Sequence, residues 1–128
     1  MILLIAFAFL FFVYEKGLAD VAEVEAPIQQ KVLSDIEKVS YVTGIPVETI
    51  RNIVWCESKD DQEARHINTN NTIDIGAAQI NSIHIAEAKV LGLNLLTREG
   101  NLAFMTVLIK REGLKPWKAS SKCWLGGR

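Results

Sequence analysis

The sequence predicts an α+β fold that is mostly helical and carries a small β-hairpin. Apolar residues recur at spacings of three and four in several segments after residue 27, which is typical of amphipathic helices. A polar, asparagine-rich stretch at residues 59–72 interrupts this pattern and favours a hairpin. The 128 residues have room for one domain with a core of ordinary size, so we expect at most one active cleft.

The beginning of the chain predicts a signal peptide. Residues 2–13 form an unbroken apolar run that is too short for the roughly 20 residues of a membrane-spanning helix but suits a signal-peptide core. Gly17 and Ala19 supply small residues for a cut after Ala19. We therefore expect a signal peptide at 1–19, a linker at 20–26 and the folded domain at 27–128. Because no lysine or arginine precedes the apolar run, an uncleaved membrane anchor is the alternative.

Two helices are expected in the first part of the domain. Pro27 opens the first helix, and Gly44 ends it. Its apolar positions are Ile28, Val32, Ile36 and Val39. Pro46 starts the second helix, which should include Trp55 in the core and place Glu57 near its C-terminal end. Its apolar face consists of Ile50, Ile53 and Val54.

Three further elements follow. Asparagines within residues 68–71 supply a turn between two short extended pieces, which predicts the hairpin. A helix is expected from about residue 83 to residue 91, where Gly92 caps it. Thr97 is placed to cap a last long helix that runs to Gly113. The buried stripe of that helix consists of Leu102, Met105, Leu108 and Ile109.

Cys56 and Cys123 are the only cysteines, and an even number suits an oxidising compartment once export is accepted. We expect them to form a disulfide that folds the aromatic tail at 116–124 back beside Glu57. Two unrelated buried thiols are the alternative. The two histidines, His66 and His84, have no cysteine or second histidine at ligand spacing, so we expect no metal site.

The composition bounds the partners. The formal net charge of −1 gives no indication of a nucleic-acid partner. The C-terminal stretch is locally basic, which usually marks a solvated face but could favour an anionic polymer. Its basic residues are Lys110, Arg111, Lys115, Lys118, Lys122 and Arg128. We expect a monomer that is exported to the periplasm, cell wall or medium, with the N-terminal apolar run as its one potential membrane tether.

Glu57 and Asp74 are the candidate catalytic pair. Glu57 lies between apolar Trp55 and polar Ser58 at a helix end, where desolvation and the helix dipole favour its protonated form. Asp74 follows an Asn/Thr-rich turn and should be hydrated and ionised at neutral pH. Two carboxylates in unlike surroundings suit acid-catalysed cleavage of a glycosidic bond. The alternatives are a surface glutamate and an aspartate that bonds the backbone of its own turn.

Five other side chains are candidates for substrate binding. Gln79 and Asn81 are two residues apart on an expected extended face, so their amides could either enter the groove or fix the loop. Trp117 and Trp124 could stack on sugar faces or fill the core. Asn101 begins the last helix and is either a cap-region amide or a cleft residue.

Together these motifs resemble a known superfamily. The pair Glu-Ser at 57–58, the segment Asp-Ile-Gly-Ala-Ala-Gln-Ile-Asn-Ser-Ile-His at 74–84 and the Asn-Leu-Ala-Phe helix at 101–104 are similar to the lysozyme-like superfamily. Small lytic transglycosylases of the soluble-lytic-transglycosylase (SLT) type are the most similar group, including those associated with conjugation and secretion machines. The spacing from Glu57 to Asp74 also resembles that of c-type lysozymes. The resemblance covers roughly residues 45–124.

The resemblance implies a lysozyme-like fold and cleavage of the β-1,4 bond between N-acetylmuramic acid and N-acetylglucosamine in peptidoglycan. It makes Glu57 the catalytic acid and base, and Ser58 its neighbour in the motif. The residues expected to line the glycan groove are Gly76, Gln79, Ile80 and Asn81. No cofactor is implied.

Two departures from the family pattern lead to further expectations. Ala77 and Ala78 stand where the family usually has a large pair such as Leu-Met, which should widen the groove or weaken its packing. The family's C-terminal Tyr-Asn-x-Gly motif is absent, and Ser-Ser-Lys-Cys-Trp at 120–124 stands in its place. Trp124 is the candidate to replace the tyrosine as an apolar wall.

The sequence therefore favours an exported lytic transglycosylase that releases 1,6-anhydro products. One alternative is a hydrolytic muramidase, in which Asp74 stabilises the anomeric carbon before water attacks. The other is a peptidoglycan-binding assembly factor that has lost turnover. Since both members of the Glu57/Asp74 pair are present, we favour an enzyme.

Overall fold

The computed structural model describes residues 32–126. The expected signal peptide at 1–19 and the linker at 20–26 lie outside the described residues. The chain from Leu33 onward forms one structural unit, and all contacts below belong to it. Within residues 32–126, no helix has the length and apolar character needed to cross a bilayer.

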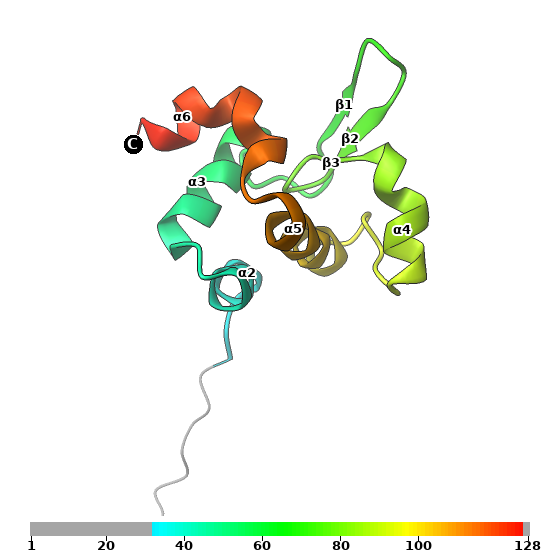
Figure 1. Ribbon diagram of the computed structural model, residues 1–128. Helices are drawn as coiled ribbons and strands as arrows, with labels where there is room; N and C mark the ends of the chain where they lie inside the picture. Colours follow the sequence, from blue (N-terminus) through cyan, green and yellow to red (C-terminus); the bar gives the residue numbers. More distant parts are fainter. Residues whose placement is uncertain (1–31, 127–128) are drawn as a thin grey trace, which may run out of the picture. The chain divides into compact units, whose positions relative to one another are not determined.

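Helices dominate the described chain, and three short strands form one antiparallel sheet of order β1-β2-β3 (Figure 1). In chain order the elements are α2 (Asp35–Thr43), α3 (Val47–Ser58), β1 (Arg65–Ile67), β2 (Ile73–Ile75), β3 (Ile80–Asn81), the 3₁₀ helix η1 (Ser82–His84), α4 (Ile85–Val90), α5 (Arg98–Glu112), the 3₁₀ helix η2 (Lys115–Ser120) and α6 (Ser121–Leu125). The predicted α+β fold, mostly helical, is confirmed. The sheet has one strand more than the predicted hairpin.

Helix α2 begins later than the sequence predicts. Ser34 caps it through a capping box, in which the Glu37 backbone N–H donates to Ser34 Oγ at 3.3 Å and the Ser34 backbone N–H donates to the Glu37 carboxylate at 2.9 Å. Val32, expected on the buried face of the helix, precedes this cap and is 88% exposed. The predicted helix start at Pro27 is therefore wrong for residues 32–34. Gly44 ends the helix as predicted.

The boundaries of the two longer helices agree with the sequence prediction. Helix α3 follows Pro46 and has Glu57 in its last turn. Thr97 caps α5 by accepting a hydrogen bond from the Gly100 backbone N–H at 3.1 Å, and Gly113 follows the end of α5. These signals are local in the sequence, which is why they could be recognised without the fold.

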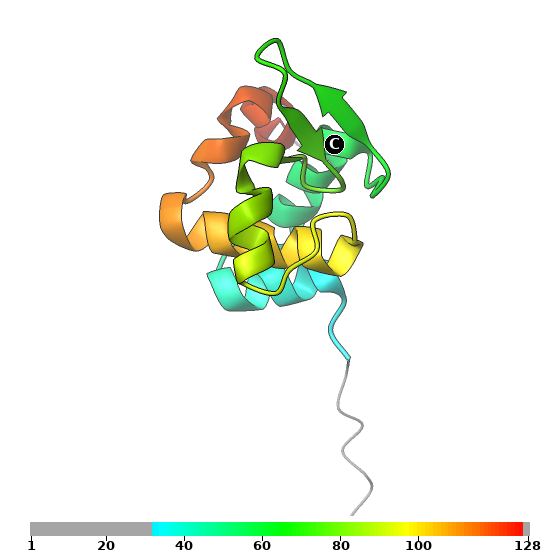
Figure 2. The same ribbon diagram turned by 90° about the vertical axis from the view of Figure 1, so that its right-hand side faces the viewer.

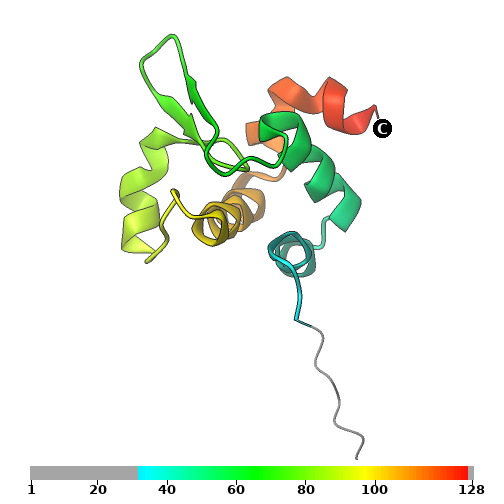
Figure 3. The same cartoon turned by 180° about the vertical axis from the view of Figure 1, so that it is seen from behind.

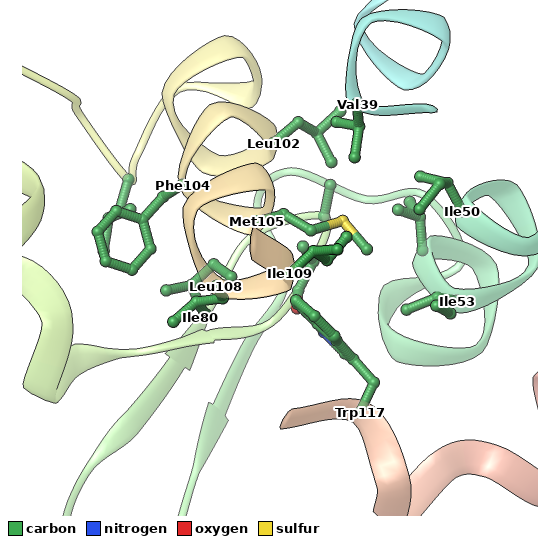
Figure 4. Packing of buried hydrophobic residues seen from close by; sticks show 14 of the residues in the cluster. Val39, Ile50, Ile53, Ile80, Leu102, Phe104, Met105, Leu108, Ile109 and Trp117 are labelled. Atoms are coloured by element: carbon green, nitrogen blue, oxygen red, sulfur yellow. The ribbon is translucent and has the colours of Figure 1, made fainter. Parts of the chain in front are cut away.

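Helix α5 supplies the centre of the core. Its buried apolar residues are Leu102, Phe104, Met105, Leu108 and Ile109. Figure 4 shows Leu102, Met105 and Ile109 on the side of α5 that faces Val39 of α2, Ile50 of α3 and Trp117 of η2, while Phe104 points to the opposite side. Figure 2 shows α2 running alongside α5, with α4 crossing it.

The prediction that Trp55 is a core residue is wrong. This side chain is 37% exposed on α3. The ammonium of Lys59 lies 5.2 Å from the centre of its ring, which is the distance of a cation–π contact. The core face of α3 consists instead of Ile50, Ile53 and Val54, as the helical spacing predicted.

The turn between β2 and β3, residues 76–79, ties the sheet to three helices. The Ser58 hydroxyl of α3 donates to the Ala77 carbonyl at 2.8 Å. The Ala78 backbone N–H donates to Asn101 Oδ1 of α5 at 2.9 Å, and Trp117 Nε1 of η2 donates to the Ala78 carbonyl at 2.9 Å. Because Ala77 and Ala78 are fully buried, these bonds hold the sheet firmly against the helices.

Candidate active site

A cleft of about 540 Å³ is lined by residues of the sheet region and of the C-terminal helices. The β1–β2 hairpin and the η2–α6 segment stand on opposite sides of α5 in Figures 1 and 3. The end of α3 contributes Glu57, and α5 contributes Leu108. The other lining residues are Asn68, Thr69, Asn70, Thr72, Asp74, Gln79, Ile80, Asn81, His84, Pro116, Trp117, Ala119 and Ser120.

Glu57 is positioned from two directions. The last turn of α3 presents it to the cleft, and the Ser120 hydroxyl donates a hydrogen bond to its Oε1 at 2.5 Å. Burial raises the pKa of Glu57, the Ser120 bond lowers it by a smaller amount, and the charge of Asp74 raises it further. The net result is a raised pKa, so Glu57 keeps its proton to higher pH than an exposed glutamate does.

Asp74 lies at the centre of β2 and also lines the cleft. It pairs with His66 on one side and Asn81 on the other. The Asn81 side-chain amide donates to Asp74 Oδ1 at 2.7 Å and to Thr72 Oγ1 at 2.9 Å. The hydrogen bond from Asn81 therefore fixes the orientation of the Asp74 carboxylate at the cleft.

The two carboxyl groups therefore meet at one cleft in unlike surroundings. Glu57 is half-buried against the C-terminal segment, whereas Asp74 sits in a polar wall of amides and hydroxyls. A carboxyl with a raised pKa can donate a proton, and a second carboxylate nearby can stabilise positive charge. This combination can carry out acid-assisted cleavage of a bond that leaves a cationic carbon.

Gln79 and Asn81 both line the cleft but do not share an extended face, so that prediction is wrong. Gln79 has a φ of 49° and closes the turn after β2. Its amide donates to the Gly76 carbonyl at 2.9 Å and to the Ala64 carbonyl at 3.3 Å, which makes it a loop-fixing amide. Asn81 is in β3 and bonds Asp74. Ile80 lines the cleft with its buried side chain.

Three residues predicted to bind substrate are structural. Gly76 is buried, and a Cβ there would lie 2.8 Å from Asn101 Nδ2. Asn101 is fully buried; its amide donates to the carbonyls of Ile75 and Leu95, and its oxygen accepts from Ala78. Ser58 bonds the turn at 76–79. None of the three is among the cleft-lining residues, because each satisfies buried backbone groups or fits beneath them.

The expectation that Ala77 and Ala78 widen the groove is also wrong. Both side chains are fully buried and neither lines the cleft. Their backbone groups accept or donate the bonds from Ser58, Asn101 and Trp117 described above. Small side chains here allow three helices to approach the turn closely.

The two C-terminal tryptophans differ in position. Trp117 is 3% exposed and is one of the residues that line the cleft. Its indole N–H donates a hydrogen bond to the Ala78 carbonyl. Trp124 is half-buried and packs on the core away from the cleft, so it does not form the predicted apolar wall. Its indole N–H donates to the Trp117 carbonyl at 3.0 Å. Both are chiefly packing residues, the reading that the area of a tryptophan favours.

The predicted disulfide between Cys56 and Cys123 is confirmed. It joins the residue before Glu57 to α6, with a Cα–Cα distance of 6.0 Å. The aromatic tail is therefore folded back on α3, as expected. A stable disulfide is compatible with an oxidising compartment.

Sequence reasoning missed Ser120 and the tip of the hairpin. Ser120 is 63 residues from Glu57 in the chain, so no local pattern links the two. Asn68, Asn70 and Thr72 were assigned to a turn only, yet their side chains line the cleft. An excess of amides and hydroxyls at a hairpin tip was the one available signal, and a solvated turn explains that signal equally well.

Among residues 32–126, no group of three or more histidine, cysteine, aspartate or glutamate side chains could hold a metal ion. No protein-family model matches the chain, and no curated protein matches it.

Proposed function

We propose that this protein is an exported lysozyme-like enzyme that cleaves the β-1,4 bond between N-acetylmuramic acid and N-acetylglucosamine in peptidoglycan. Its reaction type is that of a lytic transglycosylase, which gives 1,6-anhydro products. Peptidoglycan strands are its partner, and the protein acts as a monomer.

The observation that carries this proposal is the placement of Glu57, a half-buried carboxyl that is held by Ser120 and lines a cleft with a polar wall. The pKa of Glu57 is raised chiefly by burial, as a general acid requires at pH values where exposed carboxyls are ionised. Asp74 on the sheet is hydrogen-bonded and faces the same space. The motif resemblance to SLT-type enzymes assigns the acid role to the same glutamate.

In the proposed mechanism, Glu57 donates its proton to the oxygen that links the two sugars. The bond between that oxygen and the anomeric carbon breaks, and the N-acetyl group of the substrate stabilises the positive charge that develops. The Glu57 carboxylate then takes the proton of the muramic C6 hydroxyl, and the C6 oxygen forms a bond to the anomeric carbon. The products are a 1,6-anhydro end and a free hydroxyl on the leaving sugar.

The remaining cleft lining suits a neutral, hydroxyl-rich ligand. Side chains of Asn68, Asn70 and Asn81 are joined by hydrogen bonds to Thr72 Oγ1, which fixes this polar wall. Asn68 Oδ1 and Asn70 Nδ2 are an acceptor and a donor that this network does not use. Sugar hydroxyls and acetamido groups have the same dual character. A small set of fixed polar groups of this kind gives orientation and specificity to a binding site.

Export is supported by two features. The disulfide suits an oxidising compartment, and residues 2–13 have the length and apolar character of a signal-peptide core. Peptidoglycan lies outside the cytoplasmic membrane, so an exported enzyme would meet its substrate.

A hydrolytic muramidase is the second candidate, because Asp74 lines the cleft together with Glu57. In that reaction Asp74 stabilises or traps the anomeric carbon, and the Glu57 carboxylate takes a proton from water instead of the C6 hydroxyl. The products then carry an ordinary reducing end.

Clearing of a cell-wall suspension by purified protein tests the proposal. Wild type should clear the suspension, and Glu57→Gln should lose about 10²- to 10⁴-fold of the rate, because the amide keeps the shape but cannot supply the proton. Glu63→Gln is the matched control, since Glu63 is exposed and outside the cleft. A folded Glu57→Gln protein that clears walls at the wild-type rate would refute the role of Glu57. A wild type that binds walls without clearing them would indicate a binding factor.

A further inference from the structure

Ser120 has two acceptors for one proton. Its hydroxyl lies 2.5 Å from Glu57 Oε1 and 3.1 Å from the Trp117 backbone carbonyl. A serine hydroxyl carries a single hydrogen and can donate it fully to one acceptor at a time. An ionised carboxylate is a much stronger acceptor than a peptide carbonyl. The hydroxyl therefore favours Glu57 when the glutamate is ionised, and the two acceptors compete more evenly when it is neutral.

Ser120 is held in place by its surroundings. The Trp117 carbonyl that accepts from it also accepts from Trp124 Nε1 at 3.0 Å, while the Trp117 indole is anchored on the Ala78 carbonyl. The disulfide at Cys123 fastens the following helix to α3. The hydroxyl is thus fixed beside Glu57 before any substrate binds, as preorganised electrostatic stabilisation requires.

We propose that Ser120 is a positioning residue for Glu57: its hydroxyl holds Oε1, so that Oε2 carries the proton exchanged with the glycan, and its hydrogen bond strengthens as the carboxylate forms. This role rests on the proposed function. Among the described residues, Ser120 is the hydrogen-bond partner of the Glu57 carboxyl, so Oε1 has a built-in donor facing it. While the Ser120 hydroxyl donates to Oε1, the proton of the neutral acid is on Oε2, which is the oxygen left for the substrate.

The position of Ser120 explains how one carboxyl can serve both halves of the reaction. Burial alone favours the neutral acid and would destabilise the Glu57 carboxylate. The Ser120 bond acts in the opposite direction and stabilises the anion that appears when the proton leaves. An interaction that is stronger after proton transfer than before it lowers the barrier of the first step.

Titration of Glu57 by carbon NMR in the ligand-free protein tests this coupling without any substrate. Ser120→Ala should raise the pKa of Glu57, because the variant loses a donor that favours the charged form. Ser120→Thr keeps the hydroxyl and should titrate close to wild type. Ser121→Ala is the matched control, since Ser121 is the next residue and lies outside the cleft. The Trp117 carbonyl resonance should titrate together with Glu57 in wild type and not in Ser120→Ala.

The pH profile of cleavage of a soluble peptidoglycan oligosaccharide supplies the second readout. Activity requires the protonated acid, so it falls as pH rises through the pKa of Glu57. In Ser120→Ala this fall should move to higher pH, and kcat should drop roughly tenfold with KM nearly unchanged, as for one lost hydrogen bond to a charged group. Ser120→Thr should restore both.

An unchanged pKa of Glu57 in folded Ser120→Ala would overturn the inference, as would Ser120→Thr behaving like Ser120→Ala. If wild type does not cleave the oligosaccharide but the pKa shift appears, the proposed function fails and the coupling between Ser120 and Glu57 stands. If wild type cleaves the oligosaccharide but the pKa of Glu57 does not shift in Ser120→Ala, the coupling between Ser120 and Glu57 fails and the proposed function stands.

Discussion

Asp74 and Asn81 are cross-strand partners in the β2–β3 ladder, and the Asn81 amide donates a hydrogen bond to Asp74 Oδ1 at 2.7 Å. The same amide also holds Thr72, so one side chain fixes the polar wall of the cleft that Glu57 also lines. Asp74 thus has a structural use in the sheet as well as a place in the cleft. The two uses lead to different predictions for its variants.

Under the transglycosylase account, Asp74→Asn should retain substantial activity. The asparagine oxygen can still accept from Asn81, and the N-acetyl group of the substrate stabilises the anomeric carbon. We expect the rate of wall clearing to fall by less than about tenfold, well below the loss for a missing acid. Asp61→Asn, in an exposed loop outside the cleft, is the control. An inactive Asp74→Asn protein with an intact fold would favour the muramidase.

Removal of the disulfide should cost stability and activity together. A crosslink between residues 67 apart is worth about 4 kcal/mol in the chain-entropy model. The variant Cys56→Ser/Cys123→Ser should therefore unfold at clearly lower urea concentration, and its clearing rate should drop because the segment with Ser120 is no longer fastened to α3. Adding a thiol reductant should weaken wild type toward the double variant and leave the double variant unchanged. Equal urea midpoints for the two proteins would contradict this.

Gly76→Ala should be more harmful than Gly44→Ala, although both glycines have φ of 74°. The left-handed backbone alone costs alanine about 1–2 kcal/mol. A Cβ at Gly44 meets nothing within 4 Å, whereas one at Gly76 lies 2.5 Å from Gln62 Nε2 and 2.8 Å from Asn101 Nδ2. We expect about 1–3 kcal/mol of additional destabilisation for Gly76→Ala from overpacking. Urea denaturation of both variants measures the difference, and equal losses would show that the contact with Asn101 is relaxed at no cost.

Local signals in the sequence predicted much of the fold. Thr97, Gly92 and Gly113 mark helix ends through bonds or backbone angles that involve only near neighbours. The disulfide needed only the count of cysteines and the prediction of export. The predicted start of α2 was wrong because the apolar spacing extends to residues before Ser34, whereas the capping box at Ser34 fixes the actual start of the helix.

The roles of the polar residues depended on contacts that no local pattern contains. Asn101 bonds Ile75 and Ala78, which are 26 and 23 residues away, so a helix-start amide became a buried support. Ser58 bonds Ala77 at a separation of 19. Gln79 was predicted on an extended face with Asn81, but its positive φ places it in the turn before β3. In contrast, Glu57 and Asp74 could be recognised as candidates because each belongs to an element that the sequence predicts, the end of α3 and the hairpin strand β2. Both line the cleft.

The stability of Glu57→Gln relative to wild type should depend on pH. Since the folded state raises the pKa of Glu57 chiefly by burial, the stability that Glu57 contributes is fully present below its unfolded value of 4.5 and is lost as pH rises through the folded value. Glutamine has no charge to bury and shows no such loss. The variant should therefore gain stability relative to wild type between pH 4.5 and neutral pH. Urea midpoints of both proteins across this range would contradict the assignment if their difference stayed constant.

Mass spectrometry of the muropeptides released by wild-type protein distinguishes a lytic transglycosylase from a muramidase. We expect 1,6-anhydro-muramic ends, each lighter by one water than the corresponding reducing end, and no release by Glu57→Gln. Reducing-end products from wild type, together with a folded but inactive Asp74→Asn protein, would contradict the transglycosylase reaction and make the protein a muramidase.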